Sequence, residues 1–432
     1  MHWPAFPPTT WIWGMTPRRR PACWRAWRVA EDPAVPGGHT LLVSYLYPSC
    51  HGWGTQLRAA ALLRMLAARG GVSLLLLSRV PLSGPRDQET EALCRRVFQL
   101  RIRAEDEPRL ADGVLDGREC LPSGVVEAVQ AFAREERADT LFVFRPETCF
   151  LLEGALDSFS RRLLDLDESA CRRNEGIDRL REQAGEAAPD PARRRAHVVA
   201  RILEQKMLGR FDRVFVSSPD EARHASALCP EVRVHVLPNI MPLPAQTPPP
   251  PPAGPPEILF VGTLSYYPNE DAARFFAREI FPRIHAALGG AVRFRIVGQS
   301  CPPRVQALAA LPGVEVAGFL PDLDEAYARA SLAVVPLRAG TGTRLKILEA
   351  FGRGRPVVST SIGAEGLEVA DGRELLLRDG PEAFAQGCLE ILRNPALAAR
   401  LAEGGSRRVR ESYTPERLLA CYDAALSAVP AP

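Results

Sequence analysis

Glycines, two cations and a carboxylate lie close together between residues 340 and 349. A loop of alternating glycine and threonine, 340–343, precedes a helical pattern that begins near Thr343. The first turn of a helix presents unpaired N–H groups and the positive end of the helix dipole, so it attracts anions. Arg344 and Lys346 add positive charge, which suits a diphosphate. Glu349, if it faces the same side, can accept hydrogen bonds from two ribose hydroxyls. Ordinary surface charges on a helix are the alternative interpretation.

Lysine is rare in this chain, because of the 54 basic residues only Lys206 and Lys346 are lysine. Arginine therefore serves wherever a generic positive charge suffices. A remaining lysine indicates a place that needs a compact ammonium and does not accommodate a planar guanidinium, although chance explains either lysine taken alone about as well. The context of Lys346 favours the first interpretation for that residue.

The N-terminal half contains a candidate segment for binding a second substrate. His51, Gly52, Trp53 and Gly54 form a turn-rich segment after an apolar run. Glycine lets a ligand approach the backbone closely, and the indole of Trp53 offers a flat face on which a sugar can stack. A plain turn with a packed tryptophan is the alternative.

Two aspartates follow in the same half of the chain. Asp165 and Asp167 lie across the end of a predicted strand, and we expect only one of them to face the cleft. That carboxylate orients a ligand hydroxyl or, equally well, caps the following helix.

Composition limits the class of protein. The chain has 432 residues, 46% of them hydrophobic and 24% charged, which is typical of a globular protein with two domains. A net charge of +3 is too small for binding nucleic acid by bulk electrostatics. The 10 cysteines are scattered without a C-x-x-C pair, so we expect reduced thiols and, with no clear secretory signal, a cytoplasmic protein. Residues 1–38 hold tryptophans, prolines and an arginine run, which predicts a poorly ordered extension with weak peripheral membrane contact.

Apolar runs and helical patterns alternate along both halves of the chain. In the first, a strand at 41–45, a helix at 55–69 and a strand at 72–77 form a β-α-β unit. Further strands are expected at 97–102, 140–144, 162–166, 213–217 and 233–237, and the clearest helix at 193–208. This alternation predicts a parallel, doubly wound sheet.

A proline-dense segment, 242–256, separates this half from a second unit of the same kind. Consecutive prolines favour an extended linker. Beyond it, strands are expected at 257–262, 292–297, 314–316, 332–335 and 356–360, with a helix at 271–285 and a last helix at 415–428. We therefore predict an α/β protein with two doubly wound, Rossmann-like domains, 39–241 and 257–410, and an interdomain cleft bounded by the carboxyl ends of the strands. Residues 411–432 are expected to cross back to the N-terminal domain.

The motifs quoted above resemble those of a known family. The run Gly-Thr-Arg-Leu-Lys-Ile-Leu-Glu-Ala and the later Pro-Val-Val-Ser-Thr-Ser-Ile-Gly-Ala-Glu-Gly-Leu, both within 340–367, are similar to the donor site of family-four GT-B glycosyltransferases. The branch associated with bacterial exopolysaccharide clusters is the most similar. Matches at 260–269, 316–322, 164–169 and 216–221 extend the resemblance over most of 40–428.

The resemblance implies roles for individual residues. Glu349 matches the second acid of the Glu-x7-Glu motif and would bind the ribose, while Arg344 and Lys346 would neutralise the diphosphate as the glycosidic bond breaks. Phe319 would lie beside the nucleobase. The complete donor site implied is Gly262, Thr263, Phe319, Gly340, Thr341, Gly342, Thr343, Arg344, Lys346 and Glu349.

Two positions depart from the family pattern. The first acid of the motif, which contacts the donor sugar in relatives, is Thr341 here, so the identity of the sugar stays open. A histidine that relatives place in the N-terminal domain has no clear match, and we take Arg145, after the strand 140–144, as its substitute beside Arg344 and Lys346 in the catalytic group. His51, Gly52, Trp53, Gly54 and Asp167 are the predicted acceptor site.

The resemblance implies a retaining hexosyltransferase that takes a UDP- or GDP-linked sugar and a saccharide or lipid-linked acceptor. No metal and no cofactor are expected, because basic residues take the place of the metal. A nucleotide-sugar 2-epimerase on the same fold and a non-catalytic nucleotide-sugar-binding scaffold are the alternatives.

Overall fold

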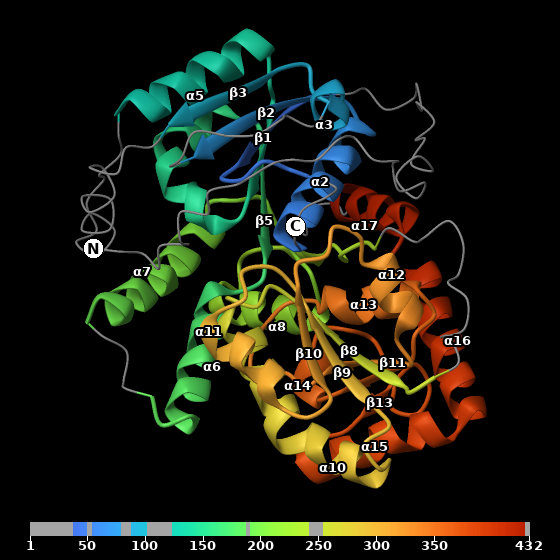
Figure 1. Ribbon diagram of the computed structural model, residues 1–432. Helices are drawn as coiled ribbons and strands as arrows, with labels where there is room; N and C mark the ends of the chain where they lie inside the picture. The colour runs from blue at the N-terminus through green and yellow to red at the C-terminus, as the bar shows by residue number, and fades with distance from the viewer. Residues whose placement is uncertain are drawn as a thin grey trace.

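The computed structural model describes residues 38–49, 54–78, 88–101, 123–186, 191–241 and 254–427. The predicted extension up to residue 37, the acceptor residues His51, Gly52 and Trp53, and most of the predicted linker lie outside the described residues. Within these ranges the chain forms two sheets, each covered by helices on both faces (Figure 1).

The N-terminal sheet has seven strands in the order β3-β2-β1-β4-β5-β6-β7, all paired in parallel. Leu41 and Leu42, which are neighbours on β1, belong to separate hydrophobic cores, so both faces of the sheet are buried. The strands are β1 (His39–Ser44), β2 (Gly71–Ser78), β3 (Val97–Arg101), β4 (Thr140–Phe144), β5 (Arg161–Asp167), β6 (Arg213–Val216) and β7 (Val234–Val236). The helices are α2 (Gly54–Ala67), α3 (Gln88–Ala92), α5 (Ser123–Glu136), the 3-10 helix η1 (Pro146–Ser158), α6 (Ala170–Gln183), α7 (Pro191–Leu208) and α8 (Pro219–Leu228).

The C-terminal sheet has six parallel strands in the order β10-β9-β8-β11-β12-β13 around one large core. The strands are β8 (Glu257–Val261), β9 (Arg293–Val297), β10 (Val314–Gly318), β11 (Leu332–Val335), β12 (Val357–Ser359) and β13 (Leu376–Leu377). The helices are α9 (Tyr267–Phe275), the π-helical turn η2 (Phe276–Ile280), α10 (Phe281–Ala287), α11 (Pro303–Gln306), η3 (Ala307–Ala310), α12 (Asp324–Arg329), α13 (Leu345–Gly352), α14 (Ser361–Ala364), α15 (Pro381–Arg393), α16 (Pro395–Ser412) and α17 (Pro415–Ser427).

Helix α17 packs on the N-terminal domain, although it follows the C-terminal one in sequence (Figure 1). Its Tyr422 ring lies 5.8 Å from the Phe215 ring on β6, measured between centroids. The hydroxyl of Thr414 accepts a hydrogen bond from Arg417 N at the start of this helix. The last helix therefore contributes to the core of the first domain.

Most predicted elements exist, but three details were wrong. Helix α13 begins at Leu345 rather than near Thr343, because Arg344 has non-helical dihedral angles (φ −83°, ψ 86°). The helix predicted at 271–285 begins four residues earlier, at Tyr267, with a proline in its first turn. The short strand β13 was not predicted, because two residues are too few to show a period.

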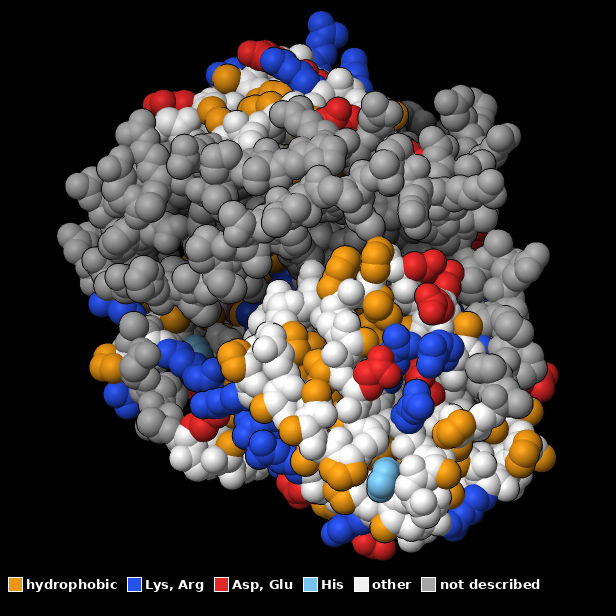
Figure 2. All heavy atoms as spheres, in the orientation of Figure 1, with side chains coloured by type: hydrophobic (Ala, Val, Ile, Leu, Met, Phe, Trp, Pro, Cys, Tyr) orange, Lys and Arg blue, Asp and Glu red, His pale blue; other side chains and the backbone are white. Residues whose placement is uncertain are grey.

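Polar contacts join the two domains where parallel strands end. The Thr343 hydroxyl donates to the carbonyl of Ser217, which follows β6, at 3.1 Å. Arg172 on α6 donates to Glu365 at 2.9 Å, and Arg304 on α11 to Glu186 at 3.1 Å. Figure 2 shows Lys and Arg side chains gathered over α6 and α11, at this boundary. The carboxyl ends of both sheets therefore face one shared region, as the sequence pattern predicts.

Candidate functional site

Lys346 points from the first turn of α13 toward the end of β8. Its Nζ atom donates to Oδ1 of Asn269 at 2.6 Å and lies 4.6 Å from the centroid of the Phe260 ring. Burial, together with the charge of Arg344, lowers the pKa of Lys346 to about 7. The ammonium is thus held inside the fold and directed at a neighbouring strand end, where a bound anion would restore its charge.

Glycine at position 262 makes this approach feasible. A Cβ atom there would lie 3.1 Å from Nζ of Lys346 and 2.9 Å from Nδ2 of Asn269. The same amide of Asn269 donates to the carbonyl of Thr263 at 3.0 Å. The predicted donor residues Gly262, Thr263 and Lys346 therefore meet at one place, and Asn269, to which the sequence analysis assigned no role, connects them.

Arg344 lies differently from the prediction. Its guanidinium donates to the carbonyls of Thr341 and Gly342, the latter at 2.9 Å, and more weakly to that of Ile362 at 3.4 Å. Gly340 has a φ of 135°, and a Cβ atom on it would lie 3.0 Å from a guanidinium nitrogen. Arg344 is therefore packed into its own loop and holds the shape of the segment before α13.

Glu349 lies on α13 beyond Lys346, and Phe319 directly follows β10. The carboxylate of Glu349 accepts a hydrogen bond from the hydroxyl of Tyr327 at 3.3 Å. Burial raises the pKa of Glu349, while Arg353 and Lys346 act against that rise. Phe319 follows Gly318, whose φ is 71°, and 62% of its surface is exposed at the end of β10. An exposed phenyl ring of this kind can stack on a flat ligand.

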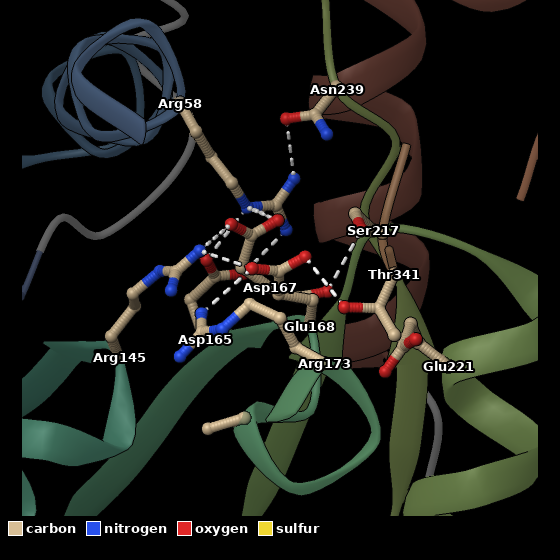
Figure 3. A network of polar contacts seen from close by, with 12 residues as sticks. Arg58, Arg145, Asp165, Asp167, Glu168, Arg173, Ser217, Glu221, Asn239 and Thr341 are labelled. Carbon is tan, nitrogen blue, oxygen red and sulfur yellow. Dashed lines mark hydrogen bonds and ion pairs between the residues drawn. The ribbon is translucent and has the colours of Figure 1, made fainter. Parts of the chain in front are cut away.

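In the N-terminal domain, both aspartates of the predicted strand contact the same arginine, so the prediction that only one faces the site was wrong (Figure 3). Arg58 forms two hydrogen bonds with Asp165, at 2.8 and 2.6 Å, and its Nε lies 3.4 Å from Asp167. The pairing of β5 with β6 shifts register between the two aspartates, and Asp167 has a φ of 60°. Side chains two residues apart on a regular strand point to the same face, so the prediction was wrong in assuming that these two aspartates alternate.

The alternative role of Asp167 as a helix cap is also excluded by geometry. The residue that caps α6 is Ser169, whose hydroxyl accepts from Arg172 N. Asp167 instead accepts from the guanidinium of Arg145 at 2.7 Å.

Arg145 has an unusual backbone conformation for a residue other than glycine, with φ at 70° and ψ at 144°. Its guanidinium, besides contacting Asp167, lies 3.4 Å from Glu168. Such strain is maintained where the surrounding structure demands it, often at functional sites. The strained position therefore supports Arg145 as a functional residue, although its charge is already paired.

Glu168 connects this cluster to the C-terminal domain and had no assigned role in the sequence analysis. Its carboxylate accepts from the hydroxyl of Thr341 at 2.9 Å and from Arg173 at 2.9 Å (Figure 3). The acid belongs to the same sequence motif as Asp165 and Asp167, so the motif itself could be recognised from the sequence. Its contact with Thr341, 173 residues away, could not be predicted from the sequence.

The predicted acceptor segment is described only at Gly54. This residue starts α2, and a Cβ atom on it would lie 2.9 Å from Cδ1 of Leu345, the first residue of α13. The start of α2 therefore reaches the start of the helix that carries Lys346.

Among the described residues, no group of three His, Cys, Asp or Glu side chains is arranged to hold a metal ion. In the same part of the chain, no helix combines the length and apolarity that crossing a membrane requires.

The sequence matches a known family in its C-terminal domain. Residues 255–394 match the family described as glycosyl transferases group 1. A curated relative, the D-inositol 3-phosphate glycosyltransferase of Acidothermus cellulolyticus, is 34% identical over 187 residues. This match covers 39% of the present chain and 41% of the relative, so the chain matches about two fifths of the relative's length. The similarity to this group therefore lies in the C-terminal domain.

Solved structures resemble almost the whole chain. Sucrose-phosphate synthase from Thermosynechococcus elongatus superposes with a TM-score of 0.65 at 20% identity, covering 91% of this chain and all of that one. The Anabaena protein HepE, in complex with UDP and glucose, superposes with a TM-score of 0.59 at 13% identity, covering 90% and 99%. At such identities the likeness concerns the fold, and the predicted GT-B class with two Rossmann-like domains is confirmed.

Proposed function

We propose that this protein is a retaining glycosyltransferase that moves a hexose from a UDP- or GDP-linked donor to a saccharide or lipid-linked acceptor. The observation that carries the proposal is the position of the Lys346 ammonium, held beside Gly262 at the end of β8. The match of residues 255–394 to glycosyl transferases group 1 supports the same reaction class.

The chemistry follows from charge. When the glycosidic bond of a nucleotide sugar breaks, negative charge develops on the leaving diphosphate. A fixed ammonium and the N–H groups at the start of α13 stabilise this developing charge in the transition state more than they stabilise the intact nucleotide sugar. They therefore lower the barrier. This positive charge at the strand ends stands in for a metal ion, which the proposal does not require.

The remaining donor residues fit the rest of the nucleotide. Glu349, held by Tyr327, offers carboxylate oxygens to ribose hydroxyls. The exposed ring of Phe319 offers a surface for the base. The solved HepE structure is a complex with UDP and glucose, and a uridine nucleotide is accordingly the first donor to test here.

The acceptor belongs to the N-terminal domain in this proposal. Gly54, at the start of α2, adjoins α13, while Asp167 lies at the end of β5 and Arg145 directly after β4. Retention of configuration, an acceptor at the inner face of a membrane, and a role in exopolysaccharide biosynthesis are taken from the family resemblance. They complete the proposal without adding to its physical basis.

Isothermal calorimetry with UDP, GDP and their hexose conjugates tests the donor site. We expect Lys346→Ala and Glu349→Ala each to weaken nucleotide binding at least about tenfold, the size of one lost charge-assisted hydrogen bond. Lys206→Ala is the matched control, because Lys206 is exposed on α7.

Affinity equal to wild type in both site variants would refute the assignment. Incubation with donor alone distinguishes the 2-epimerase alternative, since an epimerised sugar would appear without any acceptor.

A further inference from the structure

One carboxylate of the N-terminal domain reaches into the loop before α13. Glu168 follows β5, and its Oε2 atom accepts from the hydroxyl of Thr341 at 2.9 Å. Its Oε1 atom accepts from Arg173 at 2.9 Å and lies 3.4 Å from Arg145. A carboxylate oxygen can accept two hydrogen bonds, so Oε2 can accept one more, and the side chain keeps 15% of its surface exposed. Glu168 is therefore held in place by its partners and can still accept a further hydrogen bond (Figure 3).

The loop has the shape that this carboxylate requires. Gly342 has a φ of 72°, in the region that favours glycine, and a Cβ atom on it would lie 2.9 Å from Oε2 of Glu168. Any side chain at position 342 would therefore both strain the backbone and press on the carboxylate. Thr341 brings no charge of its own, so the negative charge beside this loop comes from the other domain.

Glu168 stays ionised at neutral pH. Burial by itself would raise the pKa of Glu168, but the charges of Arg173 and Arg145 outweigh it and hold the pKa below its ordinary value. An ionised carboxylate only accepts hydrogen bonds, so its natural ligands are hydroxyl or amide donors. The three guanidinium groups of Arg58, Arg145 and Arg173 face three carboxylates, which leaves no excess of positive charge here for a phosphate.

Tyr266 relates this carboxylate to the proposed diphosphate site. The Tyr266 carbonyl accepts from Asn269 N at 2.8 Å, and Asn269 in turn holds Lys346. Burial, and next the negative charge of Glu168, raise the pKa of the Tyr266 hydroxyl to about 12. Glu168 therefore acts on the same loop, β8 to α9, that positions the lysine.

We propose that Glu168 binds hydroxyl groups of the sugar carried by the nucleotide donor, so that the N-terminal domain recognises the sugar and the C-terminal domain recognises the nucleotide. This inference rests on the proposed function. It identifies a specificity-determining residue on the domain opposite the donor site that the sequence predicts. A buried acceptor of this kind discriminates strongly, because a sugar without the matching hydroxyl leaves the carboxylate unsatisfied.

Calorimetry on the full chain with free nucleotide and with nucleotide sugar tests the proposal. The ligands are UDP, GDP and their glucose, galactose, N-acetylglucosamine and mannose conjugates. In Glu168→Gln we expect the affinity for free UDP or GDP to stay within about twofold of wild type. The additional affinity conferred by the preferred sugar should fall about tenfold, as for one charge-assisted hydrogen bond.

Two further variants separate sugar binding from domain contact. Glu175→Gln is the matched control, because Glu175 is an exposed acid on α6 paired with Arg201 and should behave as wild type. Thr341→Val removes the hydroxyl that joins the domains but leaves the carboxylate, so any loss it causes should fall equally on nucleotide and nucleotide sugar. If Glu168→Gln does not fold, Glu168→Asp replaces it, because this variant keeps the charge but shortens the side chain by one methylene. The ratio between the affinities for the different sugar conjugates should then change.

The outcomes distinguish this inference from the function on which it rests. A sugar preference unchanged in Glu168→Gln, or in Glu168→Asp if only that variant folds, would overturn the inference while the function stands. An equal loss for nucleotide and nucleotide sugar in Glu168→Gln and Thr341→Val would also overturn it, because the contact would then only hold the domains together. No binding of any nucleotide or conjugate by wild type would overturn both.

Discussion

Lys346 on α13 and Asn269 in the first turn of α9 form a hydrogen bond of 2.6 Å that links two neighbouring strand-helix units of the C-terminal domain. The amide of Asn269 is itself oriented by the carbonyl of Thr263. An ammonium on a flexible stem is thereby held in one place. The position of the charge that we assign to donor binding therefore depends on a neutral amide.

Asn269→Ala should weaken nucleotide binding about fivefold to tenfold without removing the charge of Lys346. The lost partner frees the ammonium to adopt other rotamers, and neutral hydrogen bonds of this kind contribute about 1 kcal/mol. Calorimetry with UDP or GDP measures the effect. An affinity equal to that of wild type would show that Lys346 does not depend on Asn269 for its position.

Gly262→Ala should reduce nucleotide affinity about tenfold or more, since its Cβ would lie 2.9 Å from the Asn269 amide nitrogen. Gly124→Ala is the matched control, because no heavy atom lies within 4 Å of the Cβ position at Gly124 on α5. Titration of both variants with the same nucleotide makes the comparison. Equal affinities would contradict the close packing described here.

Donor affinity should fall as pH rises above about 7. In the free protein the pKa of Lys346 is lowered to about 7, so the ammonium is mostly protonated at about pH 6 and mostly neutral at about pH 9. A bound diphosphate favours the protonated form, so binding takes up a proton and weakens with rising pH. A nucleotide sugar is the suitable probe, because its esterified diphosphate keeps its charge over this range. The dependence should flatten in Lys346→Ala; an equally steep dependence in that variant would assign it to another group.

Arg58→Met should destabilise the fold by about 3–5 kcal/mol, because it leaves the buried carboxylate of Asp165 without its partner. The surface arginine Arg96, paired with Glu135, is the control, and Arg96→Met should cost less than about 1 kcal/mol. Urea unfolding followed by circular dichroism gives both values. A loss below about 1 kcal/mol for Arg58→Met would mean that the pair contributes little net stability.

The sequence predicted much of the architecture because the relevant signals are local. Alternating apolar runs and helical patterns identified most strands of both sheets, and the glycine loop with its neighbouring charges placed the start of α13 within two residues of Leu345. The rarity of lysine drew attention to Lys346. In the structure this residue is half-buried, and its ammonium contacts Asn269 and the ring of Phe260. Arg344 shows the limit of such patterns. It lies two residues before Lys346, yet it donates to carbonyls of its own loop whereas Lys346 donates to Asn269.

Composition and periodicity by themselves determined that this chain forms two parallel α/β units, and they predicted an anion site at a helix start in the second. Those signals depend on residues within a turn or a strand of one another. Only the tertiary structure decided that Asp165 and Asp167 share Arg58, which lies on α2, 107 residues before Asp165 in the chain, and that Glu168 meets Thr341 across the domain boundary. Contacts of this kind arise from how a helix packs on the sheet and from how the two domains pack, and no local period in the sequence encodes either.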